Sequence, residues 1–137
     1  MLVDVRLLLM QWRTQKKIAA KIVDKKADYI LGLKGNQGTL LDDVKTYIDD
    51  QLDNKIDDDS YQFKETANAN HGRVEERKFH LFSNIDWLEQ KPDWKGLSSI
   101  GVVESTVKNK EVTTLERRLF ITTLDSIDCF AKGVREH

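Results

Sequence analysis

The sequence has one cysteine, one proline and no long apolar run. It therefore lacks the disulfides typical of small secreted proteins and the apolar segments typical of membrane proteins. Cys129 has no second cysteine in the chain with which to form a disulfide, which is typical of a reducing compartment. At 137 residues the chain is the size of one domain and can bury a core without disulfides or metals. We find neither a signal-peptide pattern at the amino terminus nor a segment of membrane-spanning length. We therefore expect a cytoplasmic protein with no membrane partner.

The sequence also lacks a strong charge of one sign, because its net charge is −1. The distribution is nevertheless uneven: residues 1–38 balance at +5, and residues 39–60 balance at −6. Such asymmetry can create a local positive face on a neutral protein. The alternative is two solvated helix surfaces, and charge alone favours that alternative.

Patterns for catalysis and metal binding are absent as well. His71, His80 and His137 are scattered, with no zinc spacing around Cys129. The glycine-rich corner after residue 31 lacks the Lys-Ser/Thr pair of a P-loop. The aspartates between residues 42 and 59 are interpreted as a solvated face rather than a metal site. The sequence thus predicts no catalytic residue, no metal ligand and no bound cofactor.

What is present begins with a short apolar strand, Tyr29 to Leu31, followed by three glycines within seven residues. An apolar run at residues 5–12 predicts a second strand, and helical spacing at residues 15–26 predicts a helix between the two. This order indicates a parallel strand pair with a crossover helix. The glycines either only give the backbone freedom to turn or belong to a ligand site at the end of the strand. Thr39 is the expected cap of a second amphipathic helix.

From residue 60 onward the pattern changes to strands. Alternation of apolar and polar residues predicts two hairpins, and two tryptophans, Trp87 and Trp94, are expected to pack a short helical segment on the sheet. A closing amphipathic helix is expected over residues 127–134, with Ser126 or Asp125 as its cap. The predicted strands cover residues 61–63 and 73–82, joined by a turn at 67–72, and residues 99–107 and 112–123.

Basic residues recur in the predicted hairpins. Arg73, Glu75 and Arg77 share one face of a strand by its period of two, and Glu116-Arg117-Arg118 lies on another strand. Arginine binds phosphate through two parallel hydrogen bonds, so a DNA-backbone surface is one interpretation. Cross-strand Arg–Glu pairs that only hold the sheet together are equally consistent with the pattern.

Several ordered blocks resemble bacterial insertion-sequence transposases of the DDE class, specifically the H-repeat-associated (Rhs element-linked) group. The resemblance runs from Gln15 to His137. The blocks are Gln15-Lys16-Lys17-Ile18-Ala19, Asp28-Tyr29-Ile30-Leu31-Gly32-Leu33-Lys34-Gly35-Asn36-Gln37-Gly38, His71-Gly72-Arg73-Val74-Glu75-Glu76-Arg77, Ile85-Asp86-Trp87-Leu88, Trp94-Lys95-Gly96-Leu97 and Arg117-Arg118-Leu119-Phe120-Ile121-Thr122-Thr123-Leu124.

The resemblance implies a ribonuclease H-like fold interrupted by a β-rich insertion. It also implies a reaction in which three carboxylates hold two Mg²⁺ ions for DNA strand cleavage and transfer. The position of the second catalytic aspartate is Met10 here, and a thioether is not a Mg²⁺ ligand. The first acid is expected upstream of Met1 and the glutamate beyond His137. A frameshift in the gene would explain the divergent residues 1–14.

The sequence therefore predicts an α/β (α+β) fold: a partial ribonuclease H-like core at residues 1–56, a β-rich insertion at 57–124 and the start of a core helix at 125–137. The predicted function is that of a catalytically inactive transposase fragment with weak or vestigial contact to duplex DNA. The alternative is a stand-alone interaction module that forms a homodimer or binds DNA without catalysis. Family position and side-chain chemistry together give the expected DNA-binding residues, which are Lys34, Asn36, Gln37, His71, Arg73, Arg77, Arg117 and Arg118.

Overall fold

The computed structural model describes residues 12–33 and 38–135 and shows a mixed α/β protein built on one antiparallel sheet. In space the strands follow the order β1-β5-β4-β3-β2, and every neighbouring pair is antiparallel. The mixed fold class predicted from the sequence is confirmed. The elements in chain order are α1 (Trp12–Asp24), β1 (Ile30–Gly32), α2 (Gly38–Asp53), β2 (Gln62–Asn70), β3 (Arg73–Phe82), the 3₁₀ turn η2 (Lys91–Asp93), β4 (Ser99–Lys108), β5 (Thr113–Thr122) and α3 (Ile127–Arg135).

Both predicted hairpins are confirmed. The β2–β3 pairing continues to Asn70 opposite Arg73, so the turn is shorter than the one expected over residues 67–72. His71 and Gly72 form this turn with positive φ angles of 51° and 76°. Positive φ at both central residues is the geometry that matches the right-handed twist of the flanking strands. The hairpin residues therefore specify the turn, and the turn fixes the register of the two strands.

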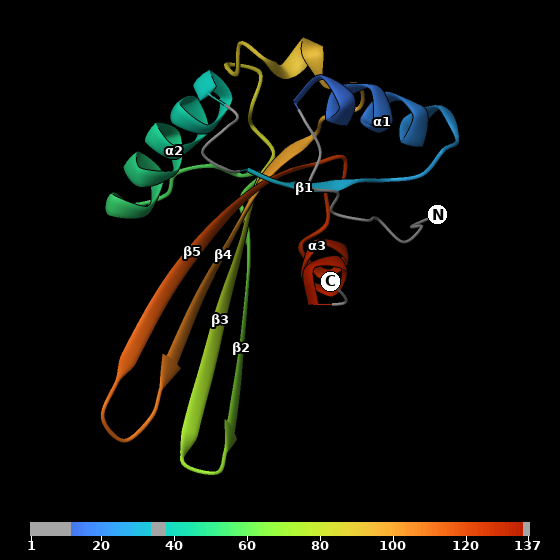
Figure 1. Ribbon diagram of the computed structural model, residues 1–137. Helices are drawn as coiled ribbons and strands as arrows, with labels where there is room; N and C mark the ends of the chain where they lie inside the picture. The colour runs from blue at the N-terminus through green and yellow to red at the C-terminus, as the bar shows by residue number, and fades with distance from the viewer. Residues whose placement is uncertain (1–11, 34–37, 136–137) are drawn as a thin grey trace.

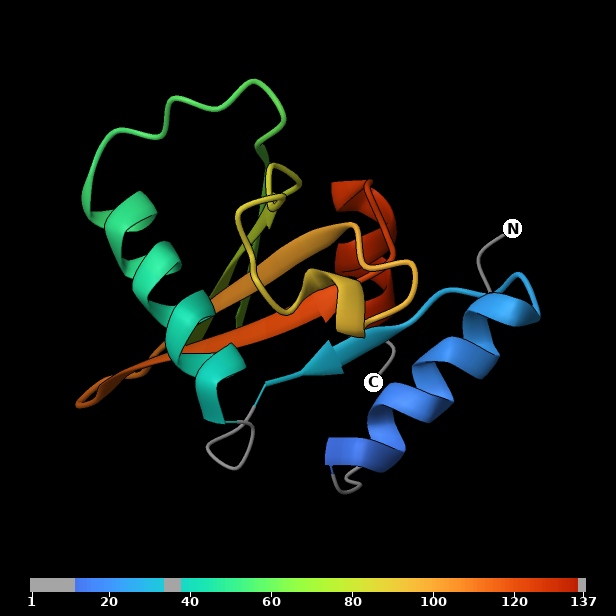
Figure 2. The same cartoon turned by 90° about the horizontal axis from the view of Figure 1, so that it is seen from above.

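The sheet is covered on both faces near β1. Helices α1 and α2 lie on one side and α3 lies on the other (Figures 1 and 2). Helix α2 buries Leu40, Val44 and Ile48, which follow its apolar stripe. On the opposite face Phe130 of α3 lies directly against Gly101 of β4, where any Cβ atom would overlap the phenyl ring. We call the face under α2 the α2 face and the face under α3 the α3 face.

The start of α3 is fixed by side chains. The backbone N–H of Cys129 donates to Oγ of Ser126 at 3.4 Å, which confirms Ser126 as the cap. The N–H of Ile127 donates to Oε1 of Gln62 in β2 at 3.0 Å. Because these donors have no partner within the helix, the two contacts satisfy them and attach α3 to the sheet.

The distal parts of β2–β5 extend away from all three helices as two long hairpins (Figure 1). Residues 113–118 of β5 are all exposed, whereas residues 119–122 are buried. Strands β3, β4 and β5 therefore have a buried half in the core and a more exposed half beyond it, whereas no residue of β2 is fully buried.

Some expectations differ from the structure. Trp12 begins α1 rather than ending a strand, and the rest of that predicted strand lies outside the described residues. Within residues 12–33 and 38–135, β1 has no parallel partner of the kind expected from the sequence. It pairs instead with β5 in antiparallel orientation. The sheet therefore contains β1, from the segment predicted as the core (residues 1–56), and β2 to β5, from the segment predicted as the insertion (residues 57–124).

Smaller differences concern caps and tryptophans. Helix α2 begins at Gly38, so Thr39 lies within its first turn instead of capping it. Trp94 is buried, as expected, but Trp87 is 43% exposed. The Trp87 ring lies against Tyr47 of α2, with centroids 4.4 Å apart, so it packs on a helix rather than on the sheet.

Candidate nucleic-acid interface

Three of the predicted arginines share the α3 face of the sheet. The side chains of residues that lie directly opposite each other in adjacent strands point to the same face of the sheet. Arg77 lies opposite Ser105, which lies opposite Glu116, and Phe79 lies opposite Val103, which lies opposite Arg118. Because Phe79 packs against Phe130 of α3, Arg118 and every second residue along these strands lie on the α3 face. Arg73, Glu75 and Arg77 follow the same alternation, as the sequence predicted.

These arginines differ in how firmly they are held. Nη2 of Arg77 pairs with Oε1 of Glu75 at 2.9 Å, a local ion pair between half-buried side chains. The guanidinium of Arg118 lies over the ring of Phe120, 5.1 Å from its centroid. Neither Arg73 nor Arg118 forms an ion pair with any residue in the described part of the chain. Their positive charges are therefore available to an anion.

An open depression lies at the tip of the β2–β3 hairpin, next to Arg73. Asn68, Asn70, His71, Arg73 and Glu75 are among the residues around this depression of about 670 Å³. His71 and Arg73 are both exposed. Together with Arg77 and Arg118, they define a surface that we call the arginine face. This surface lies in the part of the sheet that α3 does not cover.

Arg117 does not belong to this surface. Its side chain lies on the α2 face, where Nη1 contacts Oδ1 of Asp49 at 2.9 Å and Nη2 contacts Oε2 of Glu104 at 3.2 Å. Two carboxylates therefore compete with any phosphate for this guanidinium. The remaining expected residues, Lys34, Asn36 and Gln37, lie outside the described residues.

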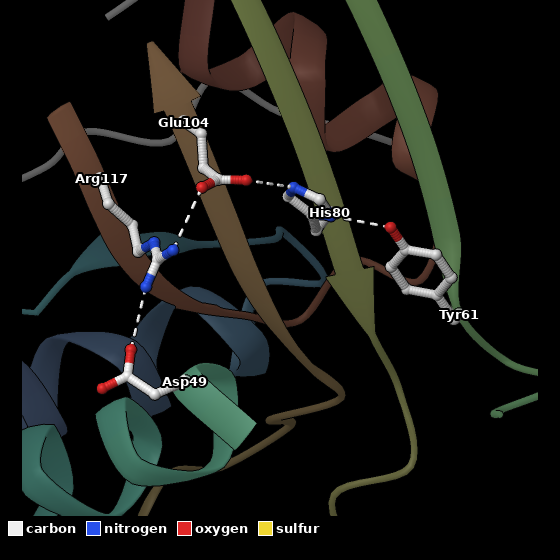
Figure 3. Close-up of polar contacts among 5 residues, drawn as sticks. All are labelled: Asp49, Tyr61, His80, Glu104 and Arg117. Carbon is white, nitrogen blue, oxygen red and sulfur yellow. Dashed lines mark hydrogen bonds and ion pairs between the residues drawn. The ribbon is translucent and has the colours of Figure 1, made fainter. Parts of the chain in front are cut away.

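Arg117 is one end of a chain of polar contacts that sequence analysis missed (Figure 3). Oε1 of Glu104 lies 2.8 Å from Nε2 of His80, and Nδ1 of His80 lies 2.7 Å from the hydroxyl of Tyr61. The chain runs Asp49–Arg117–Glu104–His80–Tyr61 and connects α2, β5, β4, β3 and the residue before β2. We call it the Asp49–Tyr61 chain.

The protonation states in this chain follow from burial. His80 is 5% exposed, and this burial lowers its pKa, an effect that the hydrogen bond and charge of Glu104 oppose. The pKa of Tyr61 is raised, first by burial and then by the charge of Glu104. A neutral His80 donates from Nε2 to Glu104 and accepts at Nδ1 from the Tyr61 hydroxyl. Every polar atom of the imidazole then has a partner.

The Asp49–Tyr61 chain fits a role in stability better than one in catalysis. The imidazole is buried among Tyr61, Phe63 and Phe82, whose rings surround it. The raised pKa of Tyr61 keeps its hydroxyl protonated, the opposite of what activates a nucleophile. The signal in the sequence was a histidine within the apolar segment Phe79 to Phe82, where a buried partner is needed.

The described residues do not form a site for the Mg²⁺ ions that the resemblance implies. Within residues 12–33 and 38–135, no three His, Cys, Asp or Glu side chains group so that they could hold a metal ion. Most aspartates of α2 and of the loop after it are exposed, whereas Asp43 accepts a hydrogen bond from Gln90 and Asp49 is paired with Arg117. Among the helices described, none is long and apolar enough to cross a membrane.

Comparison with known proteins relates the chain to transposases. It is 36% identical over 130 residues to a protein of Escherichia coli O157:H7 named "Putative transposase YncI", a match that covers 90% of this chain and 32% of that protein. It is 40% identical over 109 residues to an uncharacterized protein encoded in the dhlA 3' region of Xanthobacter autotrophicus, covering 80% and 36% respectively. It is 30% identical over 130 residues to YbfL of Escherichia coli K12, covering 90% and 33%.

These relatives support a transposase-related family for the chain. The chain spans about a third of the length of the curated relatives it matches. No family model matches the chain. No solved structure matches it either.

Proposed function

We propose that the chain is part of a DDE-class transposase of the H-repeat-associated group and contacts duplex DNA through the arginine face. The support is of two kinds: relatives with transposase names, and three arginine side chains that lie along one face of the long hairpins, from the tip of β2–β3 to the level of Val103. In this proposal β1 and the helices belong to a ribonuclease H-like core, and the long hairpins belong to its β-rich insertion.

The arginine face suits a phosphate backbone better than a base sequence. Arg73 and Arg118 have no carboxylate partner among the described residues, and Arg77 has one that a phosphate can displace. Guanidinium groups bind phosphate oxygens through two parallel hydrogen bonds. Contacts to phosphate position a protein on DNA without reading sequence. We therefore expect weak binding that does not depend on sequence and weakens with salt.

The proposal assigns no catalysis to this chain. Met10 occupies the position where the resemblance requires an aspartate, and the acids of the described residues do not converge. A nicking assay on supercoiled plasmid with Mg²⁺ or Mn²⁺ tests this point. We expect no nicking above a buffer control. Nicking that copurifies with the chain through several columns would contradict the proposal of inactivity.

Binding to DNA is tested by fluorescence anisotropy with a labelled duplex of random sequence at low salt. The variant Arg73→Gln/Arg77→Gln/Arg118→Gln removes the three arginines of the surface. The matched control Lys21→Gln/Lys25→Gln/Lys55→Gln removes three exposed positive charges elsewhere. We expect the arginine variant to lose at least tenfold in affinity and the lysine control to lose much less. Equal losses would mean that only net charge matters and would refute the arginine face.

A further inference from the structure

Among the described residues, no strand pairs with the outer edge of β5 over half of its length. Strand β1 pairs only with Phe120, Ile121 and Thr122, and the N–H of Leu33 then donates to the carbonyl of Leu119 at 2.9 Å. Beyond this bond, residues 113–118 of β5 have no strand on their outer side among the described residues. An open edge presents unpaired N–H and C=O groups to solvent and is a template for another strand.

The register of the ladder determines which residues face this open edge. Leu119 accepts a bond from the β1 side, and the N–H of Thr123 donates to the carbonyl of Tyr29 on the same side. Backbone groups alternate direction along an antiparallel strand. Thr113, Leu115 and Arg117 therefore direct their N–H and C=O groups outward.

The same edge exposes apolar side chains. Leu115 is 69% exposed and Val112, just before the strand, is 54% exposed. Leu115 also borders a groove of about 830 Å³ between α2 and β5, to which Leu33, Leu41 and Leu119 contribute. Soluble proteins usually protect an edge strand with charges, proline or a covering element. Here the centre of the open edge is a leucine next to a groove that both leucines and charged side chains line.

The edge is complementary to itself. An antiparallel copy related by a two-fold axis at Leu115 places Leu115 opposite its counterpart, Thr113 opposite Arg117 and Thr114 opposite Glu116. No like charges then face each other. A two-fold axis at Arg117 would oppose two arginines and would require Leu119, which is already bonded to Leu33. Of these two registers, the first uses the free groups without repulsion, and it is the one that brings the two exposed leucines together.

We propose that two copies of this chain associate through β5, edge to edge, about a two-fold axis at Leu115. The two sheets then form one continuous antiparallel sheet, and the two Leu115 side chains pack together beside the groove. A surface this small is at the lower end of specific interfaces, so the association depends on protein concentration. It requires no DNA and is independent of the function proposed above.

Cross-linking tests the axis directly. In a Cys129→Ser background, Leu115→Cys places a thiol opposite its own copy. The Cα–Cα distance of such a hydrogen-bonded pair is about 5.5 Å, within the range of a disulfide. The control is Phe63→Cys, which places an exposed thiol on β2, the strand at the opposite edge of the sheet. Under mild oxidation we expect covalent dimer from Leu115→Cys and mostly monomer from Phe63→Cys.

Sedimentation equilibrium without DNA provides the second measurement. We expect the parent chain to show a dimer fraction that rises with concentration, and we expect Leu115→Asp to remain monomeric at the same concentrations. Leu115 is exposed, so the substitution leaves the core intact, which circular dichroism verifies. A parent chain that stays monomeric at every concentration, or equal cross-linking of Leu115→Cys and Phe63→Cys, would overturn the proposal.

Discussion

The Asp49–Tyr61 chain makes Tyr61→Phe an informative substitution. The variant removes one hydroxyl and keeps the ring, whose centroid is 5.0 Å from that of Phe82. It leaves Nδ1 of His80, a side chain that is 5% exposed, without its donor at 2.7 Å. A buried acceptor that loses its partner costs about 1–3 kcal/mol. Because Tyr61 is only half-buried, water offsets part of this cost, and we expect a loss of about 1–2 kcal/mol.

The assay is urea unfolding followed by tryptophan fluorescence, with the double variant Tyr61→Phe/His80→Leu completing a mutant cycle. If the hydrogen bond accounts for the loss, Tyr61→Phe costs less in the His80→Leu background than in the parent chain. An unchanged unfolding free energy in Tyr61→Phe, or the same cost in both backgrounds, would refute the assignment of the Tyr61–His80 hydrogen bond.

Because the pKa of His80 is lowered in the folded protein, the free energy of unfolding depends on pH in a predictable direction. The unfolded chain takes up a proton near the ordinary histidine pKa of 6.5, whereas folded His80 does so only at lower pH. Below pH 6.5 the unfolded state therefore binds more protons, and stability falls as the pH falls. We expect the parent chain to lose stability between pH 7.5 and 5.5, and His80→Leu to lose less over the same range. Equal slopes for the two proteins would contradict the burial of a neutral imidazole.

Two further substitutions test the attachment of α3. Gly101→Ala places a methyl group against the Phe130 ring, and we expect a loss of about 1–3 kcal/mol in urea unfolding; an unchanged midpoint would show that α3 is not seated on β4. Ser126→Ala removes the cap of α3, and we expect a loss of about 1 kcal/mol in the same assay, with Ser126→Asp restoring most of it. Failure of Ser126→Asp to recover stability would contradict the capping role.

Local patterns in the sequence predicted the hairpins well, because strand alternation and the His71-Gly72 turn act over neighbouring residues. The closing helix and its cap at Ser126 follow from the same kind of short-range signal. The pairing of β1 with β5 could not be predicted in this way, because the two strands are far apart in the sequence and no turn residue links them.

The candidate site was predicted only in part for a related reason. The period of two placed Arg73 and Arg77 together, and the same period puts Arg118 and Arg117 on opposite faces. The two predicted DNA-binding residues Arg117 and Arg118 therefore lie on different faces of the sheet. The Asp49–Tyr61 chain depends on the registers of three strands and the position of α2, none of which a single segment of sequence specifies.

The central claim is that phosphate contacts are made by the arginine face, and the salt dependence of DNA binding tests it most directly. The affinity for duplex DNA is measured from low to physiological salt for the parent chain and for Arg73→Gln/Arg77→Gln/Arg118→Gln. Each phosphate contact contributes about 0.9 to the slope of log affinity against log salt, so the account predicts that the triple variant loses up to roughly 2.7 of this slope. Identical slopes for the two proteins would contradict the account.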